Sequence, residues 1–199
     1  MACTDAASCA SYPTPTLRDV DPIVQMDLET LRNRIVDDPD VPEVVRGFLA
    51  KGAPIEEIRL DAEGTWWHEG ERFENERLIA LFSASVVRTR RGNWVLHIPP
   101  YTYPIVVDLV GHFARTGRFD GAMFDAEVSD GKPARIDARS FSTDGDAILI
   151  GRTADGRDVR LLDGAYQAVL DRVDHQEDTW VIRTDSGTYP LAPIAAPST

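Results

Sequence analysis

Apolar residues recur at helical spacing in two short stretches near the start of the chain. The first stretch contains Leu28, Leu31 and Ile35, and the second contains Val44, Val45, Phe48 and Leu49. Asp21-Pro22 is typical of a helix N-terminus, Asp40 is expected to cap the second helix, and Gly52 is expected to end it. Because Asp37-Asp38-Pro39 cannot continue a helix, the sequence predicts a hairpin of two amphipathic helices.

Apolar and polar residues then alternate, as they do in a strand hairpin. The two predicted strands cover residues 58–61 and 65–68 and flank a turn at Glu63-Gly64. Asn75 is expected to open a helix, whose apolar face comprises Leu78, Ile79, Leu81, Phe82 and Val86. Two further strands are expected at residues 94–98 and 103–109. The first module is therefore predicted to be a hairpin, a helix and a second hairpin.

The last two strands return later in the chain. Trp94-Val95-Leu96 and Thr102-Tyr103-Pro104-Ile105 match Trp180-Val181-Ile182 and Thr188-Tyr189-Pro190-Leu191, 86 positions downstream. Residues 147–150 and 158–162 are expected to form the first hairpin of this second copy, before a helix that Asp163 opens and that carries Tyr166, Val169, Leu170 and Val173. Trp66 has no aromatic counterpart there. The matches indicate an internal duplication.

The remaining segments complete a predicted α+β fold. Residues 1–20 are rich in small polar residues and proline, and they predict a mobile tail. Residues 110–145 are rich in turn signals and are expected to link the modules with short antiparallel strands. The expected architecture is two tandem similar modules, each an antiparallel sheet with one packed helix, preceded by an N-terminal helical hairpin. We expect the first unit to cover residues 21–110 and the second to cover residues 111–199.

Charge argues against a nucleic-acid partner. The chain has 21 Lys and Arg against 33 Asp and Glu, and its net charge of −12 repels phosphate backbones and anionic lipid. The basic run Arg88-Thr89-Arg90-Arg91 is interpreted as a solvated helix end. No stretch approaches the roughly 20 apolar residues that cross a bilayer, and no secretory leader is recognised. We therefore expect a cytoplasmic protein without a membrane partner, in which Cys3 and Cys9 are free thiols.

The two copies differ in charge where each leaves its helix. The first copy leaves through Arg88 to Arg91, and the second through Asp174-His175-Gln176-Glu177-Asp178. In one interpretation these are exposed connections that have diverged freely. In the other, they meet as complementary patches, within one chain or between the chains of a homodimer.

No catalytic or metal-binding set stands out in the sequence. His68-Glu69 begins like a zinc-protease motif, but the second histidine of that motif would stand at Arg72. No metal site and no cofactor are predicted. The four histidines are scattered, at positions 68, 97, 112 and 175, and no serine lies in a nucleophile elbow. A small hydrolase that uses His68 or His97 with a nearby carboxylate is retained as an alternative function.

The adjacent Trp66 and Trp67 suggest a binding surface. Successive strand residues point to opposite faces, so both indoles cannot enter one core. The second indole either packs beneath the helical hairpin of residues 28–49, or lines a ligand groove or partner surface. The expected site is the cleft between the modules or a surface whose candidate ligand-binding residues are Trp66, Trp67, His68, Arg72 and Tyr101.

One stretch of the first module resembles a known bacterial family. The run Gly64-x-Trp66-Trp67-His68-Glu69-Gly70, then Phe73 and Leu78-Ile79-x-Leu81-Phe82, is similar to Domain of Unknown Function 1285. This resemblance implies an α+β fold with repeated motifs and a role in signal transduction. The family's Thr-Pro-x-Glu and acidic-Asp-x-Pro-Phe segments are replaced by Ile98-Pro99-Pro100-Tyr101 and Asp108-Leu109-Val110-Gly111-His112. A different ligand is therefore expected.

The duplicated scaffold, the lack of a catalytic set and the spare tryptophan favour a binding function. We expect a module that binds a small molecule or a protein, with a role in bacterial signal transduction or regulation. The sequence does not identify the ligand or the partner.

Overall fold

Two short helices open the part of the chain that the structure describes. The structure is a computed structural model and describes residues 27–145, 147–176 and 179–194. The predicted tail and Asp21-Pro22 lie outside these residues. Helix α1 (Leu28–Val36) is capped by Asp27, whose carboxylate accepts a hydrogen bond from the backbone N–H of Thr30. Helix α2 (Glu43–Ala50) follows Pro42 without a side-chain cap, so the prediction that Asp40 caps it is wrong.

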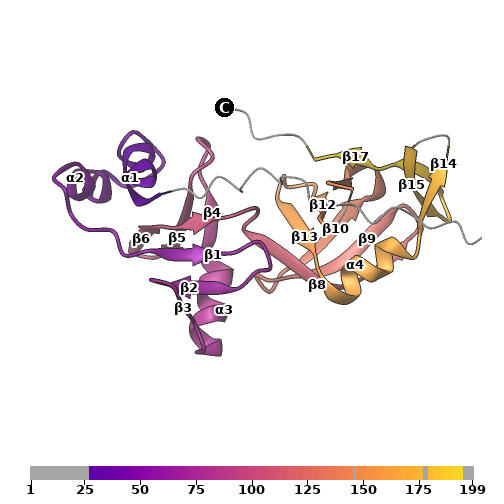
Figure 1. Ribbon diagram of the computed structural model, residues 1–199, viewed down its shortest axis with the longest axis horizontal. Helices are drawn as coiled ribbons and strands as arrows, with labels where there is room; N and C mark the ends of the chain where they lie inside the picture. Colours follow the sequence, from indigo (N-terminus) through magenta and orange to yellow (C-terminus); the bar gives the residue numbers. More distant parts are fainter. Residues whose placement is uncertain (1–26, 146, 177–178, 195–199) are drawn as a thin grey trace, which may run out of the picture.

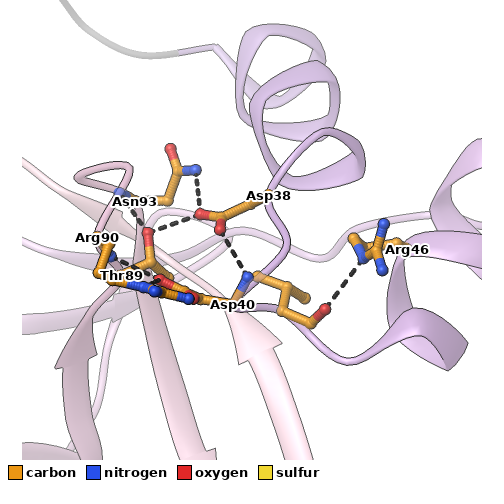
Figure 2. A network of polar contacts seen from close by, with 7 residues as sticks. Asp38, Asp40, Arg46, Thr89, Arg90 and Asn93 are labelled. Carbon is orange, nitrogen blue, oxygen red and sulfur yellow. Dashed lines mark hydrogen bonds and ion pairs between the residues drawn. The ribbon is translucent and has the colours of Figure 1, made fainter.

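A buried carboxylate fastens this helical hairpin to the first module (Figure 2). Asp38, which is 0% exposed, accepts 2.6 Å hydrogen bonds from the Thr89 hydroxyl and from the Asn93 side-chain amide. Asp40 is occupied by Arg90, whose Nε lies 2.9 Å from one carboxylate oxygen. The apolar faces of both helices pack on residues of the first module in a common core that includes Leu31, Ile35, Leu49, Val95 and Val106.

The first module contains one helix and two sheets. Strands β1 (Ile58–Leu60), β2 (Trp66–His68), β3 (Glu71–Arg72) and β7 (Val106–Val107) form a sheet in the order β3-β2-β1-β7. After helix α3 (Glu76–Ser85), strands β4 (Val86–Arg88), β5 (Trp94–Ile98) and β6 (Tyr101–Pro104) form the second sheet. The predicted hairpin and the cap at Asn75 are confirmed.

Two details of the predicted first module are wrong. Val86 begins a strand rather than ending the helix, so Arg88 ends β4 and Thr89 to Arg91 follow it into a turn instead of forming a helix end. The expected strand at residues 103–109 breaks at Ile105, whose N–H bonds to the carbonyl of Trp94. Beyond this break the chain changes sheets and pairs with β1 in parallel.

The second module repeats this order. Its strands are β11 (Ser142–Thr143), β12 (Leu149–Arg152), β13 (Asp158–Leu161) and β17 (Ala192–Pro193), which lie in the order β13-β12-β11-β17. Helix α4 (Asp163–Leu170) precedes the sheet of β14 (Val173–Gln176), β15 (Thr179–Thr184) and β16 (Gly187–Pro190). Leu162 occupies the N-cap position, so the helix begins at Asp163 without a side-chain cap.

Strand registers establish the duplication residue by residue. Leu96 pairs with Tyr103 in the first module, and Ile182 pairs with Tyr189 in the second. Parallel closing strands also recur, with Leu60 opposite Val107 and Thr143 opposite Pro193. The predicted match of residues 147–150 and 158–162 with the first hairpin of the first module is shifted by one strand. The two-residue strand β11 corresponds to β1, and β12 and β13 correspond to β2 and β3.

An inserted meander separates the two copies in sequence. It consists of β8 (His112–Asp120), β9 (Met123–Val128) and β10 (Pro133–Asp137), followed by the short helix η1 (Ala138–Ser140). Strand β8 pairs in parallel with β13, so the meander extends the second module's sheet to seven strands among the described residues. The expected antiparallel linking strands are confirmed. No helix of the described residues is both long and apolar enough to cross a membrane.

The two halves of the molecule lie side by side, with the helical hairpin at the far end of the first module (Figure 1). Phe113 of β8 and Ile150 of β12 join the hydrophobic core that contains Trp66 and Leu60 of the first module. The buried guanidinium of Arg160 donates to the carbonyl of Ala62 across the same boundary. The structure confirms an α+β fold of two similar modules preceded by a helical hairpin.

Candidate functional site

A cavity of about 340 Å³ opens between the two modules. We call it the inter-module pocket. Its first wall is formed by the end of α3, by β4 and by Trp94 at the start of β5. Its second wall is formed by His112 at the start of β8 and by the turns that join β9 to β10 and β12 to β13. Its lining residues are Ala84, Val86, Val87, Arg88, Trp94, His112, Asp130, Lys132, Asp155, Gly156, Arg157 and Asp158.

His112 is the unusual residue of this pocket. The side chain is 7% exposed, and its Nδ1 is buried without a hydrogen-bond partner among the described residues. Burial lowers the pKa of the imidazole below its ordinary value; Asp130 acts in the opposite direction, and Arg157 lowers the pKa further. His112 is therefore neutral at pH 7, so that one of its ring nitrogens carries a hydrogen and is a potential donor while the other is a potential acceptor. Buried polar groups are rarely left unpaired, so this ring is suited to a polar partner in the pocket.

Ion pairs hold the second wall in place. The guanidinium of Arg157 lies 2.7 Å from Asp130 and 2.8 Å from Asp155, and the Asp130 side chain is only 5% exposed. Asp155 also accepts a hydrogen bond from the Thr153 hydroxyl, which is the largest cause of its lowered pKa. The two carboxylates thus form ion pairs with one guanidinium. These ion pairs connect the β9–β10 turn to the β12–β13 turn in the wall that contains His112.

Two cations at the pocket are less fully paired. Arg88 lies 3.8 Å from Asp158, whose carboxylate is bound more closely by Arg152 at 2.7 Å. Lys132 lies 3.6 Å from Asp130, which is already paired with Arg157. Because the guanidinium of Arg88 and the ammonium of Lys132 are both more than half exposed, they remain available to an anionic group.

The first wall supplies an aromatic and aliphatic surface. The ring of Trp94 lies edge to face with His112, with centroids 6.4 Å apart, and Arg88 lies 5.4 Å from the indole centroid. A Cβ placed on Gly111 would lie 2.5 Å from the Trp94 ring, so the backbone packs tightly behind the indole. The pocket therefore combines an apolar side, two available cations and a neutral imidazole.

Among the described residues, no group of three or more histidine, cysteine, aspartate or glutamate side chains is arranged to hold a metal ion. Cys3 and Cys9 lie outside those residues. The carboxylate of Asp130, which lines the pocket, is paired with Arg157 and Lys132.

The sequence-predicted tryptophans separate as expected. Trp66 is 2% exposed, and its indole N–H donates to Ser83 at 3.1 Å within the core. Trp67 points to the opposite side of β2, where its indole N–H donates to Asp61 at 2.7 Å. Of the two alternatives for the second indole, packing beneath residues 28–49 is not what the structure has, because the core of that hairpin contains Val95 and Val106 but not Trp67, which lines a cavity.

The other predicted site residues are only partly brought together. Arg72 pairs with Trp67 across β2 and β3, whereas His68 lies 3.4 Å from Glu56. Tyr101 is 75% exposed and lies on β6, in the other sheet of the module. Trp67 lines a separate cavity of about 390 Å³, whose other lining residues are Glu57, Arg59, Asp61, Glu69, Gly70 and Asp108. Burial is the largest influence on Asp108 and raises the pKa of that carboxyl, although Arg59 lies 2.7 Å from it.

Of the two histidines of the hydrolase alternative, His97 is exposed and His68 is partly exposed. The Nε2 of His68 lies 3.4 Å from a Glu56 carboxylate oxygen, and the side chain is 40% exposed. His97 lies 3.1 Å from the hydroxyl of Thr102, its cross-strand partner. His68 and His97 do not line the inter-module pocket or the Trp67 cavity.

For one of the two interpretations of the charged segments, a meeting within one chain, the described residues of these segments show other ion pairs instead. Arg88 faces Asp158, Arg90 binds Asp40, and Asp174 binds Arg183. Glu177 and Asp178 lie outside the described residues. An interface between two chains stays a prediction.

Sequence reasoning named the cleft between the modules but missed the residues that line it. In the sequence, His112 is one of four scattered histidines, and Asp130-Gly131 and Asp155-Gly156 are ordinary turn signals. The available signal for the site was that His112 stands at the start of a strand and that Asp130 and Asp155 stand in two turns. These three residues lie together only if the strand start and both turns are at the same end of one sheet. That signal requires the parallel pairing of His112 with Val159, which no local pattern reveals.

One comparison with a solved structure supports the fold. No family model matches the sequence. No curated protein matches it in sequence either. Among solved structures, a DUF1285 family protein from Silicibacter pomeroyi is similar, with a TM-score of 0.55, 15% identity, 70% of this chain covered and 81% of that chain. A DUF1285 family protein from Shewanella baltica has a TM-score of 0.47 and 14% identity over 59% of this chain and 92% of its own. The fold of this chain thus resembles that of the DUF1285 protein from Silicibacter pomeroyi.

Proposed function

We propose that this protein is a ligand-binding module whose ligand occupies the inter-module pocket. The observation that carries the proposal is the buried Nδ1 of His112, which has no hydrogen-bond partner in the part of the chain that the structure describes, on a side chain that lines a cavity between two modules. An unsatisfied buried polar group destabilises a fold, so a bound partner that completes its hydrogen bonds has a direct energetic advantage.

The proposed ligand is a small anion with an apolar body. Its carboxylate or phosphate is placed near Arg88 and Lys132, the two cations with long ion pairs. Its apolar part lies against Trp94 and Val86, and a polar group reaches His112. Guanidinium groups favour such anions because they present several N–H donors in one plane.

The proposed role is regulatory, in the cytoplasm of a bacterium and in signal transduction. The support is architectural: both modules contribute walls, so an occupant contacts both and favours the arrangement that binds it. A ligand changes the balance between two arrangements only through its different affinity for them. A pocket that spans a module boundary meets this requirement.

A thermal-shift screen tests the proposal. The panel contains small carboxylates, phosphates and nucleotides, each beside an uncharged analogue of the same shape. We expect a subset of the anions to raise the melting temperature of the wild type, because ligands that bind only the folded state stabilise it. The Arg88→Gln variant is expected to lose this response. Arg77→Gln, which removes an exposed arginine from α3, serves as the matched control and is expected to keep it.

A second proposed location is the surface around Trp67, His68, Arg72 and Tyr101. The cavity at Trp67 supports it, because an indole and several carboxylates suit a cationic ligand rather than an anionic one. The same screen separates the two locations: an anion response that requires Arg88 supports the inter-module pocket, whereas a cation response that requires Trp67 supports the second location. A uniformly flat screen contradicts both.

A further inference from the structure

The second module contains a cavity at the position that a tryptophan fills in the first. Leu60 pairs with Trp66 across β1 and β2, and Thr143 pairs with Leu149 across β11 and β12. The closing parallel strands align Leu60 with Thr143 independently. Trp66 and Leu149 are therefore equivalent positions of the repeat.

In the first module the indole of Trp66 is the centre of the core. Its ring lies edge to face with Phe82, with centroids 5.4 Å apart. Its N–H donates to the Ser83 hydroxyl at 3.1 Å. Val86 and Ile105 pack in the same cluster, together with the partly buried Trp94.

In the second module three apolar neighbours have equivalents, but the indole is absent. Val173, Trp180 and Leu191 occupy the positions of Val86, Trp94 and Ile105, as the strand pairings show. With Leu149, Tyr166 and Leu170 they line a mostly apolar cavity of about 120 Å³. Leu149 is smaller than the equivalent Trp66, and Thr143 is smaller than the equivalent Leu60. The cavity is the space that the larger side chains fill in the first module.

We propose that this cavity is a second binding site, and that it accepts a small apolar aromatic ring. An apolar cavity of about 150 Å³ stays dry and binds benzene, so the observed volume suits a single ring. The polar neighbour of the indole is also missing, because Leu170 stands three residues before Val173 as Ser83 stands three residues before Val86. A ring without an N–H group is therefore favoured over an indole.

Access to the cavity is provided at Trp180. This residue is 48% exposed, and its ring lies edge to face with His175, with centroids 4.8 Å apart. Leu170, which also lines the cavity, is 43% exposed. An aromatic ligand that enters here covers part of both side chains and contacts the indole directly. This site shares no lining residue with the inter-module pocket, so the two proposals stand or fall separately.

Toluene is the probe for the test, because it is a single apolar ring and does not absorb at the red edge of the tryptophan band. Added to the wild-type protein, it is expected to change the intrinsic fluorescence saturably and to raise the melting temperature. Trp180→Phe is expected to lose most of the fluorescence change while keeping the thermal shift. Trp94→Phe, the equivalent change in the first module, is expected to keep both responses.

The decisive variant is Leu149→Trp, which restores the side chain of the first module. We expect it to weaken toluene binding at least tenfold, while Val44→Trp on the exposed surface of α2 leaves binding unchanged. If Leu149→Trp does not fold, Thr143→Leu replaces it, because it restores the Leu60 side chain and narrows the same cavity. Either variant, when folded, overturns the proposal if it binds toluene as tightly as the wild type. An unresponsive wild type overturns it as well, whether the cavity is too tight or is covered by another part of the chain or by a second copy.

Discussion

The carboxylate of Asp38 accepts a hydrogen bond from the hydroxyl of Thr89, 51 positions further along the chain, and both groups are buried (Figure 2). Asn93 donates to the same carboxylate oxygen. Burial alone raises the pKa of Asp38, but the hydrogen bonds from Thr89, Asn93 and the Asp40 backbone N–H outweigh it and lower the pKa below its ordinary value. The helical hairpin is thus attached to the first module by a charged group as well as by apolar contacts.

Asp38→Ala is therefore expected to destabilise the fold. It removes the acceptor of two buried donors, and such losses cost about 2–4 kcal/mol in the free energy of unfolding. Urea denaturation measures the loss, with Asp37→Ala as control because Asp37 is exposed and caps α1 through its backbone alone. Equal stabilities of the two variants would show that the network contributes little.

Acidification is expected to weaken the fold through His112. Burial lowers the pKa of this imidazole in the folded state, while the unfolded chain keeps the ordinary value of 6.5. As the pH falls below 6.5 the unfolded chain binds a proton first, so the free energy of unfolding decreases until the folded state is protonated too. Above that pH both states are neutral and the contribution is constant. Asp130 and Asp155 raise this pKa, and Arg157 and Lys132 lower it.

The measurement is urea unfolding at about pH 7.5 and about pH 5.5, for the wild type and for His112→Phe. We expect the wild type to lose more stability than the variant between the two conditions. A variant that loses as much as the wild type would mean that other groups cause the pH dependence.

Replacement of glycine by alanine is expected to lower the stability of the fold at Gly111 and to raise it at Gly47. A Cβ at Gly111 would lie 2.5 Å from the Trp94 ring and 2.7 Å from Val86, so Gly111→Ala should destabilise by about 1–3 kcal/mol. Gly47 lies inside α2 with nothing within 4 Å of its Cβ position, so Gly47→Ala should stabilise by about 0.5–1 kcal/mol. Thermal melts of the two variants check the signs, and a stabilised Gly111→Ala would contradict the close packing behind Trp94.

Trp66 and Trp180 should respond differently to truncation. Trp66→Leu removes a buried indole and leaves the Ser83 hydroxyl without its partner, at an expected cost of about 2–3 kcal/mol. Trp180→Leu acts on a side chain that is 48% exposed and should cost less than about 1 kcal/mol. Chemical denaturation measures the loss in free energy of unfolding for each variant. Equal losses would mean that Trp180 is packed as tightly as Trp66, which would argue against a cavity beside it at Leu149.

The sequence was sufficient to predict the duplication because its evidence is local. Each matched segment is a hairpin whose strands pair within a few residues, as Leu96 with Tyr103 and Ile182 with Tyr189. The strands after α3 and α4 were missed because Val86 and Val173 continue the apolar spacing of the preceding helix, and only their pairing with Leu96 and Ile182 identifies them as strands.

The candidate site was less accessible to prediction because its members are far apart in sequence. Arg88, His112, Asp130 and Arg157 meet only after β8 has paired with β13 and the modules have packed together. The adjacent tryptophans correctly predicted that the two indoles lie on opposite faces of the strand. The sequence did not decide what the second indole, Trp67, contacts. The indole N–H found the nearby carboxylate of Asp61, which lies in the turn that the strand hairpin creates.

The central claim is that the inter-module pocket binds an anion through His112. Its most direct test is isothermal titration of the most stabilising anion from the screen into the wild type and into His112→Phe, which keeps a ring of similar size but has no ring nitrogen. We predict one site per chain in the wild type and affinity at least tenfold lower in the variant, the loss expected when a buried hydrogen bond is removed. Equal affinity in the two proteins would contradict the account.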